Sequence, residues 1–263
     1  MLINNIPFKP QRYSSGEIKK FDDQLKDFLK YKDINILYNS DISILELFMI
    51  IEYFKENEKV INLTLAYLPY QRMNHKSEET IKYVAKIFNK LELNSITILE
   101  PHCELHYLNN ASKISLVKLI FDKVANEINF DKKKDLLIFT DKGSKEKFGS
   151  LSKNSVYFKK TRDKVTGLIN SYKLVGEINP NQKLILVDDI ISSGDTIIEA
   201  VSHLKKLTKQ KVTIITSHFE NNIYNERLFK NKTVEKIYSS NSLRKNGNKK
   251  LKLYNIEEIY GKH

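Results

Sequence analysis

The chain has 263 residues, of which 41% are hydrophobic and 29% are charged, and its net charge is +12. This length suffices for one large domain or two ordinary ones, and no apolar run approaches the ~20 residues that a membrane helix needs. The N-terminus lacks the long apolar segment of a signal peptide. A single cysteine, Cys103, excludes an internal disulfide framework. We therefore expect a cytoplasmic protein that does not associate with membranes.

The excess of positive charge is typical of proteins that bind nucleic acid or polyanionic small molecules. The lysines, however, are scattered over every segment of the chain, and the densest clusters, at 131–135 and 244–250, are typical of solvated loops. No interleaving of aromatic and basic residues and no helix-turn-helix pattern is present in the sequence. Nucleic acid is therefore a disfavoured partner, and a polyanionic small molecule is favoured.

Short apolar runs rich in β-branched residues alternate with longer amphipathic segments. The expected strands are 34–39, 60–69, 95–101, 135–140, 155–158, 183–189, 211–218, 234–240 and 251–256. The expected helices are 43–57, 78–92, 112–128, 195–208 and 222–230. This alternation predicts an α/β fold with mainly parallel sheets flanked by helices. The most polar break near the middle is 129–135, so we predict two α/β domains, at 1–129 and 130–263.

One stretch combines a strand, two acids, a small polar turn and a helix. Residues 183–201 read KLILVDDIISSGDTIIEAV, in which an apolar run ends at Asp188 and Asp189. The following helix is expected to have one apolar face, made of Ile197, Ile198, Val201, Leu204 and Leu207. Open α/β sheets bind ligands beyond the carboxyl ends of their strands. The two aspartates are therefore expected at a ligand site.

The turn after the aspartates is typical of phosphate binding. Ser192, Ser193 and Gly194 are small, and the backbone N–H groups of such a turn, at the positive end of a helix, hold an oxyanion. The carboxylates would repel a phosphate, but they accept hydrogen bonds from hydroxyl groups. A vicinal diol next to a phosphate is a phosphorylated ribose. The alternative interpretation of the same residues is a helix cap and an ordinary turn.

Six motifs in order resemble those of one enzyme family. VDDIISSGDT (187–196) resembles the signature shared by type I phosphoribosyltransferases and phosphoribosyl-diphosphate (PRPP) synthetases. The other five resemble synthetase segments: RYSSGE (12–17), LAYLPYQRMNHK (65–76), ITILEPHCE (96–104), FTDKGS (139–144) and VYFKKTRD (156–163). The chain is thus similar to a short, divergent member of the ribose-phosphate pyrophosphokinase family, of a kind often encoded by phages. This resemblance implies two domains of the type I phosphoribosyltransferase fold.

The resemblance also implies an activity and its partners. The family transfers the β,γ-diphosphate of ATP to the anomeric hydroxyl of a ribose 5-phosphate moiety and releases AMP. Because charge builds up on the phosphate oxygens, Mg²⁺ and cationic side chains are needed to neutralise it. The expected partners are ATP, a phosphorylated ribose, and further copies of the chain in a dimer or hexamer.

Family positions imply roles for individual residues. Those matching ATP contacts are Tyr13, Glu17, Arg72, His75 and Lys76, of which Tyr13 and Glu17 match adenine contacts usually supplied by a neighbouring subunit. His75 and Lys76 stand where the family usually has an acid and an arginine. Those matching the ribose-phosphate site are Asp188, Asp189, Ser192, Ser193, Gly194, Asp195 and Thr196.

The same comparison implies catalytic and metal-binding residues. His102 matches the histidine of the metal and ATP site, and Asp141 matches a carboxylate near the metal and the ribose. Lys159 matches the lysine of the basic catalytic loop. Arg162 is its expected partner, with Lys160 as the alternative, because the register of this loop is uncertain by one residue.

The loop departs from the family at two positions: Ser192 replaces an acid, and Asp195 replaces a glycine that faces the 5′-phosphate. At 4 Å, two like unit charges repel by about 4 kcal/mol at an effective dielectric constant near 20. Two alternatives follow. Asp195 points away, as acids in the first turn of a helix do, or the acceptor carries a less charged 5′ group. ADP-ribose is such an acceptor; it would give ADP-ribose 1-diphosphate in NAD⁺ salvage.

Two other functions remain open from the sequence. A type I phosphoribosyltransferase would need one α/β domain and would need neither the 65–76 stretch nor His102. A non-catalytic regulatory protein that binds synthetase subunits should lack the basic loop and the metal-site histidine, and this chain has a match for both.

Overall fold

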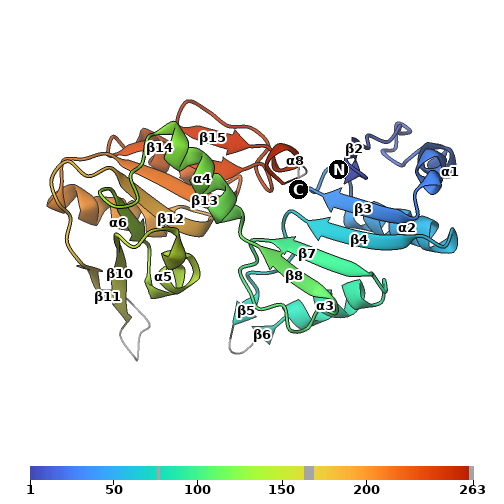
Figure 1. Cartoon of the computed structure of the whole chain (residues 1–263), viewed down its shortest axis with the longest axis horizontal. Helices are drawn as coiled ribbons and strands as arrows, with labels where there is room; N and C mark the ends of the chain where they lie inside the picture. The colour runs from blue at the N-terminus through green and yellow to red at the C-terminus, as the bar shows by residue number, and fades with distance from the viewer. Residues whose placement is uncertain (76–77, 163–168, 261–263) are drawn as a thin grey trace. The chain divides into compact units, whose positions relative to one another are not determined.

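Two α/β units, each with its own sheet and core, make up the chain (Figure 1). The computed structural model describes residues 1–75, 78–162 and 169–260. The first unit contains Met1–Ile114 together with the helix α8 (Ile256–Ile259), and the second contains Ser115–Asn255.

The first unit has a mostly parallel sheet in the order β2-β1-β3-β4-β7-β8. Its strands are β1 (Leu2–Ile3), β2 (Ile6–Pro7), β3 (Asp33–Tyr38), β4 (Val60–Leu65), β7 (Ser95–Leu99) and β8 (Ala111–Ile114). Strands β3, β4, β7 and β8 are parallel, while β1 and β2 are antiparallel additions at one edge. A separate hairpin consists of β5 (Asn74–His75) and β6 (Glu78–Glu79).

Helices cover one face of this sheet. The helices of the unit are α1 (Phe21–Leu25), α2 (Ile44–Glu56), α3 (Ile81–Asn89) and α8, with a 3-10 helix at Lys26–Lys30. The helix α2 begins at a capping box, in which Ser43 and Glu46 each satisfy a backbone N–H of the other. Apolar residues of α2, α3, β3, β4 and β7 form one buried cluster. Alternate residues on the other face of β4, such as Asn62 and Thr64, are polar.

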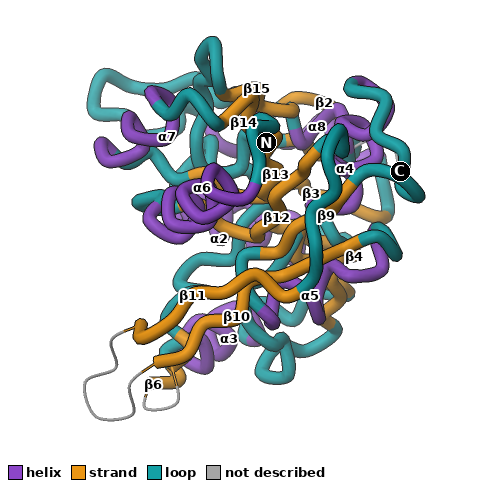
Figure 2. Tube along the Cα trace, turned by 90° about the vertical axis from the view of Figure 1, so that its left-hand side faces the viewer, coloured by secondary structure: helices purple, strands orange, loops and turns teal. Residues whose placement is uncertain are grey.

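The second unit has a sheet in the order β11-β10-β9-β12-β13-β14-β15. Its strands are β9 (Leu136–Phe139), β10 (Ser155–Arg162), β11 (Ile169–Val175), β12 (Leu184–Ile191), β13 (Val212–Phe219), β14 (Val234–Ser240) and β15 (Leu251–Tyr254). All neighbours are parallel except β10 and β11, which run side by side as an antiparallel hairpin (Figure 2). The strand β12 therefore lies in the middle of the sheet.

Side chains on both faces of β12 are buried. The helices of the unit are α4 (Leu116–Glu127), α5 (Lys142–Phe148), α6 (Asp195–Leu207) and α7 (Glu226–Lys230), with 3-10 helices at Gly149–Leu151 and Ile223–Asn225. Apolar residues of α6 share a core with Leu186 on one face of β12. Ile185 and Val187, which alternate with Leu186, are fully buried as well. Burial on both faces explains why the run LILV is uninterrupted by polar residues.

The division between the units differs from the expected boundary at 129/130, because α4 belongs to the second unit. Five apolar residues of α4 are fully buried, and the helix packs on β13 and β14. At its end, the Glu127 carboxylate accepts hydrogen bonds from the Tyr238 hydroxyl (3.0 Å), the Lys252 ammonium (2.6 Å) and the Tyr254 hydroxyl (3.1 Å). The polar break at 129–135 is thus a loop inside the second unit.

Several expected elements change in detail. The helix expected at 112–128 begins at Leu116, because Ala111–Ile114 form the strand β8. The expected apolar face of α6 ends early, since Leu207 is 57% exposed. The strand β11 and the helix α5 were not expected from the sequence. Among the described residues, no helix combines the length and the apolar character needed to cross a membrane.

Candidate active site

Asp188 and Asp189 lie near the carboxyl end of β12, between the parallel strands β9 and β13. The strand continues to Ile191, so the aspartates are part of the strand and not of the turn after it. Both residues are only partly exposed. They occupy the edge of the sheet at which open α/β folds bind ligands.

The turn that follows β12 requires a glycine at Gly194. This residue has a φ of +81° and precedes the first residue of α6. A Cβ atom there would lie 2.6 Å from the Leu228 Cδ1 atom of α7. Both the left-handed backbone and the close approach of α7 therefore favour glycine. The result is a tight turn whose backbone leads directly into the N-terminus of a 13-residue helix.

The carboxyl group of Asp188 has a strongly raised pKa. Burial, followed by the negative charges of Asp189 and Asp141, raises the pKa of Asp188 to about 7. The Ser144 hydroxyl (3.3 Å) and the backbone N–H of Asp189 (3.0 Å) donate to its Oδ1 atom. Three carboxylates thus create negative potential at this end of β12, which a bound cation would relieve.

The side chain and backbone of Asp189 are both held by partners. Its carboxylate forms an ion pair with Lys147 of α5 at 3.1 Å. Its backbone carbonyl accepts a hydrogen bond from the fully buried Ser217 hydroxyl on β13 at 2.6 Å. Neither Lys147 nor Ser217 was identified from the sequence. The three-residue spacing of Ser144 and Lys147, which places both on one face of a helix after Asp141, is a signal that could have indicated them.

Asp141 is the N-cap of α5, where its side chain accepts a hydrogen bond from the backbone N–H of Ser144 at 2.9 Å. Aspartate is a favoured N-cap because its oxygen satisfies a free N–H of the first turn. The cap holds Asp141 beside the Ser144 hydroxyl that contacts Asp188. The residues at 139–144 and 188–189, separate in the sequence, therefore form one acidic cluster.

The serines and Asp195 of the turn are engaged by neighbouring side chains. The Ser192 hydroxyl donates to Glu220 at 2.5 Å, and the Ser193 hydroxyl donates to Asp195 at 2.5 Å. Asp195 is the first residue of α6, and its other oxygen accepts from Arg227 at 2.7 Å. The hydrogen bond from Ser193, followed by Arg227, lowers the pKa of the Asp195 carboxyl. Thr196 follows in the first turn of the helix and is partly buried.

The basic loop residues lie on the hairpin of β10 and β11. Lys159 is exposed, next to the fully buried Phe158, and its Cα partner across the hairpin is Lys173. Arg162 ends β10 at an irregularity of the register. The side chains of Lys160 and Arg162 lie outside the described part of the structure. Lys159 is therefore the cation of this loop whose side chain the structure describes.

In the first unit, Tyr13 and Glu17 are brought together by a turn. The backbone N–H of Tyr13 donates to the Glu17 carbonyl at 2.9 Å. Arg12 forms an ion pair with Glu46 of α2 and so ties this turn to the helix. The Tyr13 ring is 54% exposed, and the Lys19 ammonium lies 5.0 Å from its centre. The turn thus presents an aromatic ring and a carboxylate to solvent.

The 65–76 and 96–104 stretches meet through Gln71. The backbone N–H of His102 donates to the Gln71 side-chain oxygen at 2.9 Å, and Gln71 is fully buried. Close by in sequence, Glu100 is 2% exposed and has a φ of +50° at the end of β7. Arg72 and His102 are exposed. Gln71 and Glu100 were not identified from the sequence; a buried amide and a buried acid have no periodic signal of their own.

Two expected ATP contacts fall at the limit of what the structure describes. His75 pairs with Glu78 in the β5–β6 hairpin, but its side chain lies outside the described residues, as does all of Lys76. The two expected metal ligands belong to different units, His102 to the first and Asp141 to the second.

The acidic cluster of Asp141, Asp188 and Asp189 is compatible with Mg²⁺. This ion prefers oxygen ligands and is often held by one or two carboxylates together with water and substrate phosphates. Within the described ranges, no group of three or more His, Cys, Asp or Glu side chains is placed to hold a metal ion by itself, so water and substrate phosphates would have to supply further ligands. Burial, followed by the charges of Asp189 and Asp141, raises the pKa of Asp188, and a bound cation would favour the charged form of this carboxyl.

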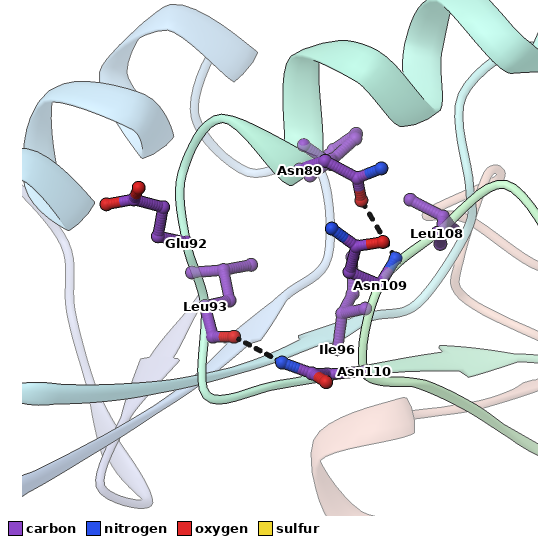
Figure 3. Close-up of a pocket in the computed structure, with 8 residues that line it drawn as sticks. Asn89, Glu92, Leu93, Ile96, Leu108, Asn109 and Asn110 are labelled. Carbon is purple, nitrogen blue, oxygen red and sulfur yellow. Dashed lines mark hydrogen bonds between the residues drawn. The ribbon is translucent and has the colours of Figure 1, made fainter.

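A cavity of about 210 Å³ lies elsewhere in the first unit (Figure 3). Hydrogen bonds from the Asn109 backbone to Asn89 (2.9 Å) and from the Asn110 amide to the Leu93 carbonyl (3.1 Å) connect its walls. It adjoins the amino-terminal half of β7, at Ile96, and contains none of the expected site residues. Glu92 is the charged residue in its lining, so the cavity lacks a cation that could bind phosphate.

Replacing Asp188 with asparagine should stabilise the metal-free protein near neutral pH. Between the ordinary value of 3.8 and the folded-state pKa of about 7, the folded protein retains a proton that the unfolded chain has lost, so stability falls as pH rises. One pKa unit corresponds to about 1.4 kcal/mol, and we expect a gain of at least about 1 kcal/mol at pH 7.

Thermal unfolding in EDTA measures this effect at pH 4 and pH 7. The Tm of Asp188→Asn should exceed that of wild type at pH 7, and the gap should narrow toward pH 4. Asp122→Asn, which changes an exposed carboxylate of the same unit, is the control. A Tm difference between Asp188→Asn and wild type that is equal at pH 4 and pH 7 would contradict the raised pKa of Asp188.

Comparisons with known proteins support the expected family. Residues 119–247 match the model of the phosphoribosyl transferase domain. A ribose-phosphate pyrophosphokinase of Sulfolobus acidocaldarius is 29% identical over 221 residues, which are 77% of this chain and 72% of that protein. One from Mycoplasma genitalium is 23% identical over 267 residues, which are 95% of this chain and 79% of the relative.

A solved structure resembles the fold of the whole chain. The phosphoribosylpyrophosphate synthetase of Mycobacterium smegmatis superposes with a TM-score of 0.73 and 18% identity, covering 97% of this chain and 87% of that one. The expected fold class, two type I phosphoribosyltransferase-like domains, is therefore confirmed. The expected enzyme class, a diphosphotransferase, is confirmed by the named relatives. These relatives and the fold support membership of the chain in the ribose-phosphate pyrophosphokinase family.

Proposed function

We propose that this protein transfers the β,γ-diphosphate of ATP to the anomeric hydroxyl of ribose 5-phosphate, giving PRPP and AMP. The observation that carries the proposal is the pair Asp188 and Asp189 on β12, followed by the tight turn into α6. Named relatives that are ribose-phosphate pyrophosphokinases supply the reaction class.

In this proposal the second unit binds the acceptor. The two aspartates accept hydrogen bonds from the ribose hydroxyls, and Lys147 and Ser217 orient Asp189 for this task. The 5′-phosphate binds at the Ser192–Gly194 turn, where backbone N–H groups and the positive end of α6 favour an anion. The pairing of hydroxyl acceptors with a phosphate site suits a ribose monophosphate.

Ribose 5-phosphate is the acceptor that the charges favour. The case for ADP-ribose rested on an unpaired carboxylate at Asp195 that would repel a terminal phosphate. In the structure, Asp195 is the first residue of α6, forms an ion pair with Arg227 at 2.7 Å and accepts a hydrogen bond from Ser193. Because the charge is paired, the turn does not demand a less charged 5′ group.

The first unit binds ATP in this proposal. Arg72 contacts the phosphates, and His102, whose backbone is held by Gln71, lies beside them. The acceptor oxygen attacks the β-phosphorus, the bond to the bridging oxygen of AMP breaks, and the negative charge moves toward AMP. Lys159 stabilises this charge, since a positioned cation is most effective where charge develops in the transition state.

A magnesium ion would be held by Asp141, next to Asp188, together with phosphate oxygens. When bound, it supplies charge neutralisation on the diphosphate. The protein groups around it, namely the cap that orients Asp141 and the hydroxyl of Ser144, set the position of the carboxylate. The oxygen donors of this cluster support the choice of ion.

The proposal also includes a homo-oligomer, a dimer or hexamer, in the cytoplasm. Apolar side chains exposed on two neighbouring helices, α2 and α3, support self-association. They are Leu45 (66% exposed), Met49 (47%), Tyr83 (57%) and Ile87 (51%). A ring contact between Phe48 and Phe88 at 5.6 Å joins these helices, so the exposed residues belong to one surface.

Nucleotide analysis tests the reaction directly. Incubation with ATP, Mg²⁺ and ribose 5-phosphate should form AMP and PRPP in equal amounts, with no ADP. A parallel incubation with ADP-ribose should be at least about tenfold slower in kcat/KM. Formation of ADP and a monophosphorylated sugar would contradict diphosphate transfer. A reaction that needs PRPP and a nucleobase instead would identify a phosphoribosyltransferase.

A further inference from the structure

The segment that follows β13 forms one wall of the Ser192–Asp195 turn. The Ser192 hydroxyl donates to Glu220, and the Gly194 backbone packs against Leu228, which is fully buried. On the outer side, Arg227 of α7 reaches Asp195. Three successive parts of the turn thus contact residues 220–228.

The guanidinium of Arg227 is held by several groups. One of its nitrogens, Nη2, donates to the Asp195 carboxylate at 2.7 Å and to the Ser193 carbonyl at 3.4 Å. Its Nε atom donates to the Tyr224 carbonyl at 3.3 Å, and the group lies 5.6 Å from the centre of the Tyr224 ring. The fully buried Leu228 next in sequence anchors the helix. The cation is therefore positioned over the turn and over its carboxylate.

We infer that Arg227 is a specificity-determining residue of the acceptor site, which neutralises Asp195 so that a terminal phosphate can occupy the turn. This inference rests on the proposed acceptor, ribose 5-phosphate. An unpaired carboxylate within a few ångströms of a phosphate dianion repels it. The Arg227 charge, 2.7 Å from the carboxylate, cancels that repulsion.

The ion pair itself contributes little to folding. The Arg227 and Asp195 side chains are 51% and 67% exposed, and exposed ion pairs are weak because water and salt screen them. A role limited to stability would therefore leave substrate affinity unchanged. If Arg227 instead neutralises Asp195, its loss should weaken the binding of ribose 5-phosphate, but only while Asp195 keeps its charge.

A double-mutant cycle separates these roles. The variants are Arg227→Ala, Asp195→Asn and the two combined, measured by steady-state kinetics and by calorimetric binding of ribose 5-phosphate. Arg227→Ala should weaken ribose 5-phosphate binding and raise its KM by at least about tenfold, which corresponds to ~1.4 kcal/mol, with the KM for ATP unchanged. In the double variant, affinity should return to within about threefold of wild type, because no unpaired charge remains.

Lys230→Ala is the matched control, since it removes another exposed cation of α7 that forms an ion pair, with Glu226 at 3.8 Å. It should change neither affinity nor Tm. Unchanged ribose 5-phosphate affinity in Arg227→Ala, or an equal loss for both substrates, would overturn the inference. A double variant as weak as Arg227→Ala would overturn it too, since Arg227 would then bind the phosphate itself.

Failure of the proposed function has a different signature. If wild type forms no AMP with ribose 5-phosphate, the proposed reaction is wrong. The binding measurements still test the inference about Arg227. If Arg227→Ala binds ribose 5-phosphate weakly and adding Asp195→Asn restores the binding, charge neutralisation by Arg227 is supported. If wild type shows no measurable binding of ribose 5-phosphate, the inference is overturned.

Discussion

Lys159→Ala should lower kcat by about two to three orders of magnitude, with little change in the affinity for ribose 5-phosphate. Loss of one well-placed charge-stabilising donor typically costs ~10²–10³ in rate, or about 3–4 kcal/mol of transition-state stabilisation. Lys159 is exposed on the hairpin, while its neighbour Phe158 is fully buried and anchors the strand. The substitution therefore removes the charge without disturbing the core.

Rapid-quench measurement of AMP formation distinguishes loss of chemistry from loss of binding. Lys153→Ala removes an exposed positive charge from the same unit and should keep kcat within about twofold of wild type. Lys173→Ala tests the residue directly across the hairpin. A Lys159→Ala enzyme that retains most of its rate would move the role to Lys160 or Arg162.

Replacing both Asp188 and Asp189 with asparagine should raise the KM for ribose 5-phosphate by at least about a hundredfold. Each hydrogen bond from a ribose hydroxyl to a carboxylate is stronger than one to an amide, and hydrogen bonds to charged groups contribute about 1.5–3 kcal/mol. The double variant also releases Lys147 from its ion pair. The KM for ATP should change much less, because the proposed ATP contacts lie in the first unit.

Steady-state kinetics in both substrates, with calorimetric binding of ribose 5-phosphate, measures this effect. Asp122→Asn with Glu235→Gln makes the same change in net charge at two exposed positions of the second unit and should leave both KM values near wild type. Unchanged acceptor affinity in the Asp188 and Asp189 variant would remove the assignment of these residues to the ribose.

The regular elements of the fold are well predicted by periodicity. Every expected strand is observed, one at 234–240 with the expected ends and the others with shifted ends. An uninterrupted apolar run such as residues 184–187 is typical of a strand buried on both faces. The elements that were not expected are short or polar. The helix α5 has seven residues and begins with Lys142, and its cap at Asp141 becomes meaningful only when the preceding strand is known.

The domain boundary shows a different limit of sequence reasoning. A polar break at 129–135 looks like a linker, but α4 before it is buried on β13 and β14, and Glu127 binds side chains more than a hundred positions away. Amino-acid composition indicates local polarity, but it does not indicate on which sheet an amphipathic helix packs. The boundary at Ile114 therefore depends on tertiary contacts.

The sequence by itself determined the parallel α/β architecture, the place of Asp188 and Asp189 on a buried strand, and the turn into α6, because each depends on residues close together in the chain. Only the tertiary structure decided which charges meet. Lys147 reaches Asp189 across 42 positions, Arg227 reaches Asp195 across 32, and Ser217 reaches the Asp189 backbone across 28. Ion pairs and hydrogen bonds act over a few ångströms, and only the folded sheet brings such distant residues within that range.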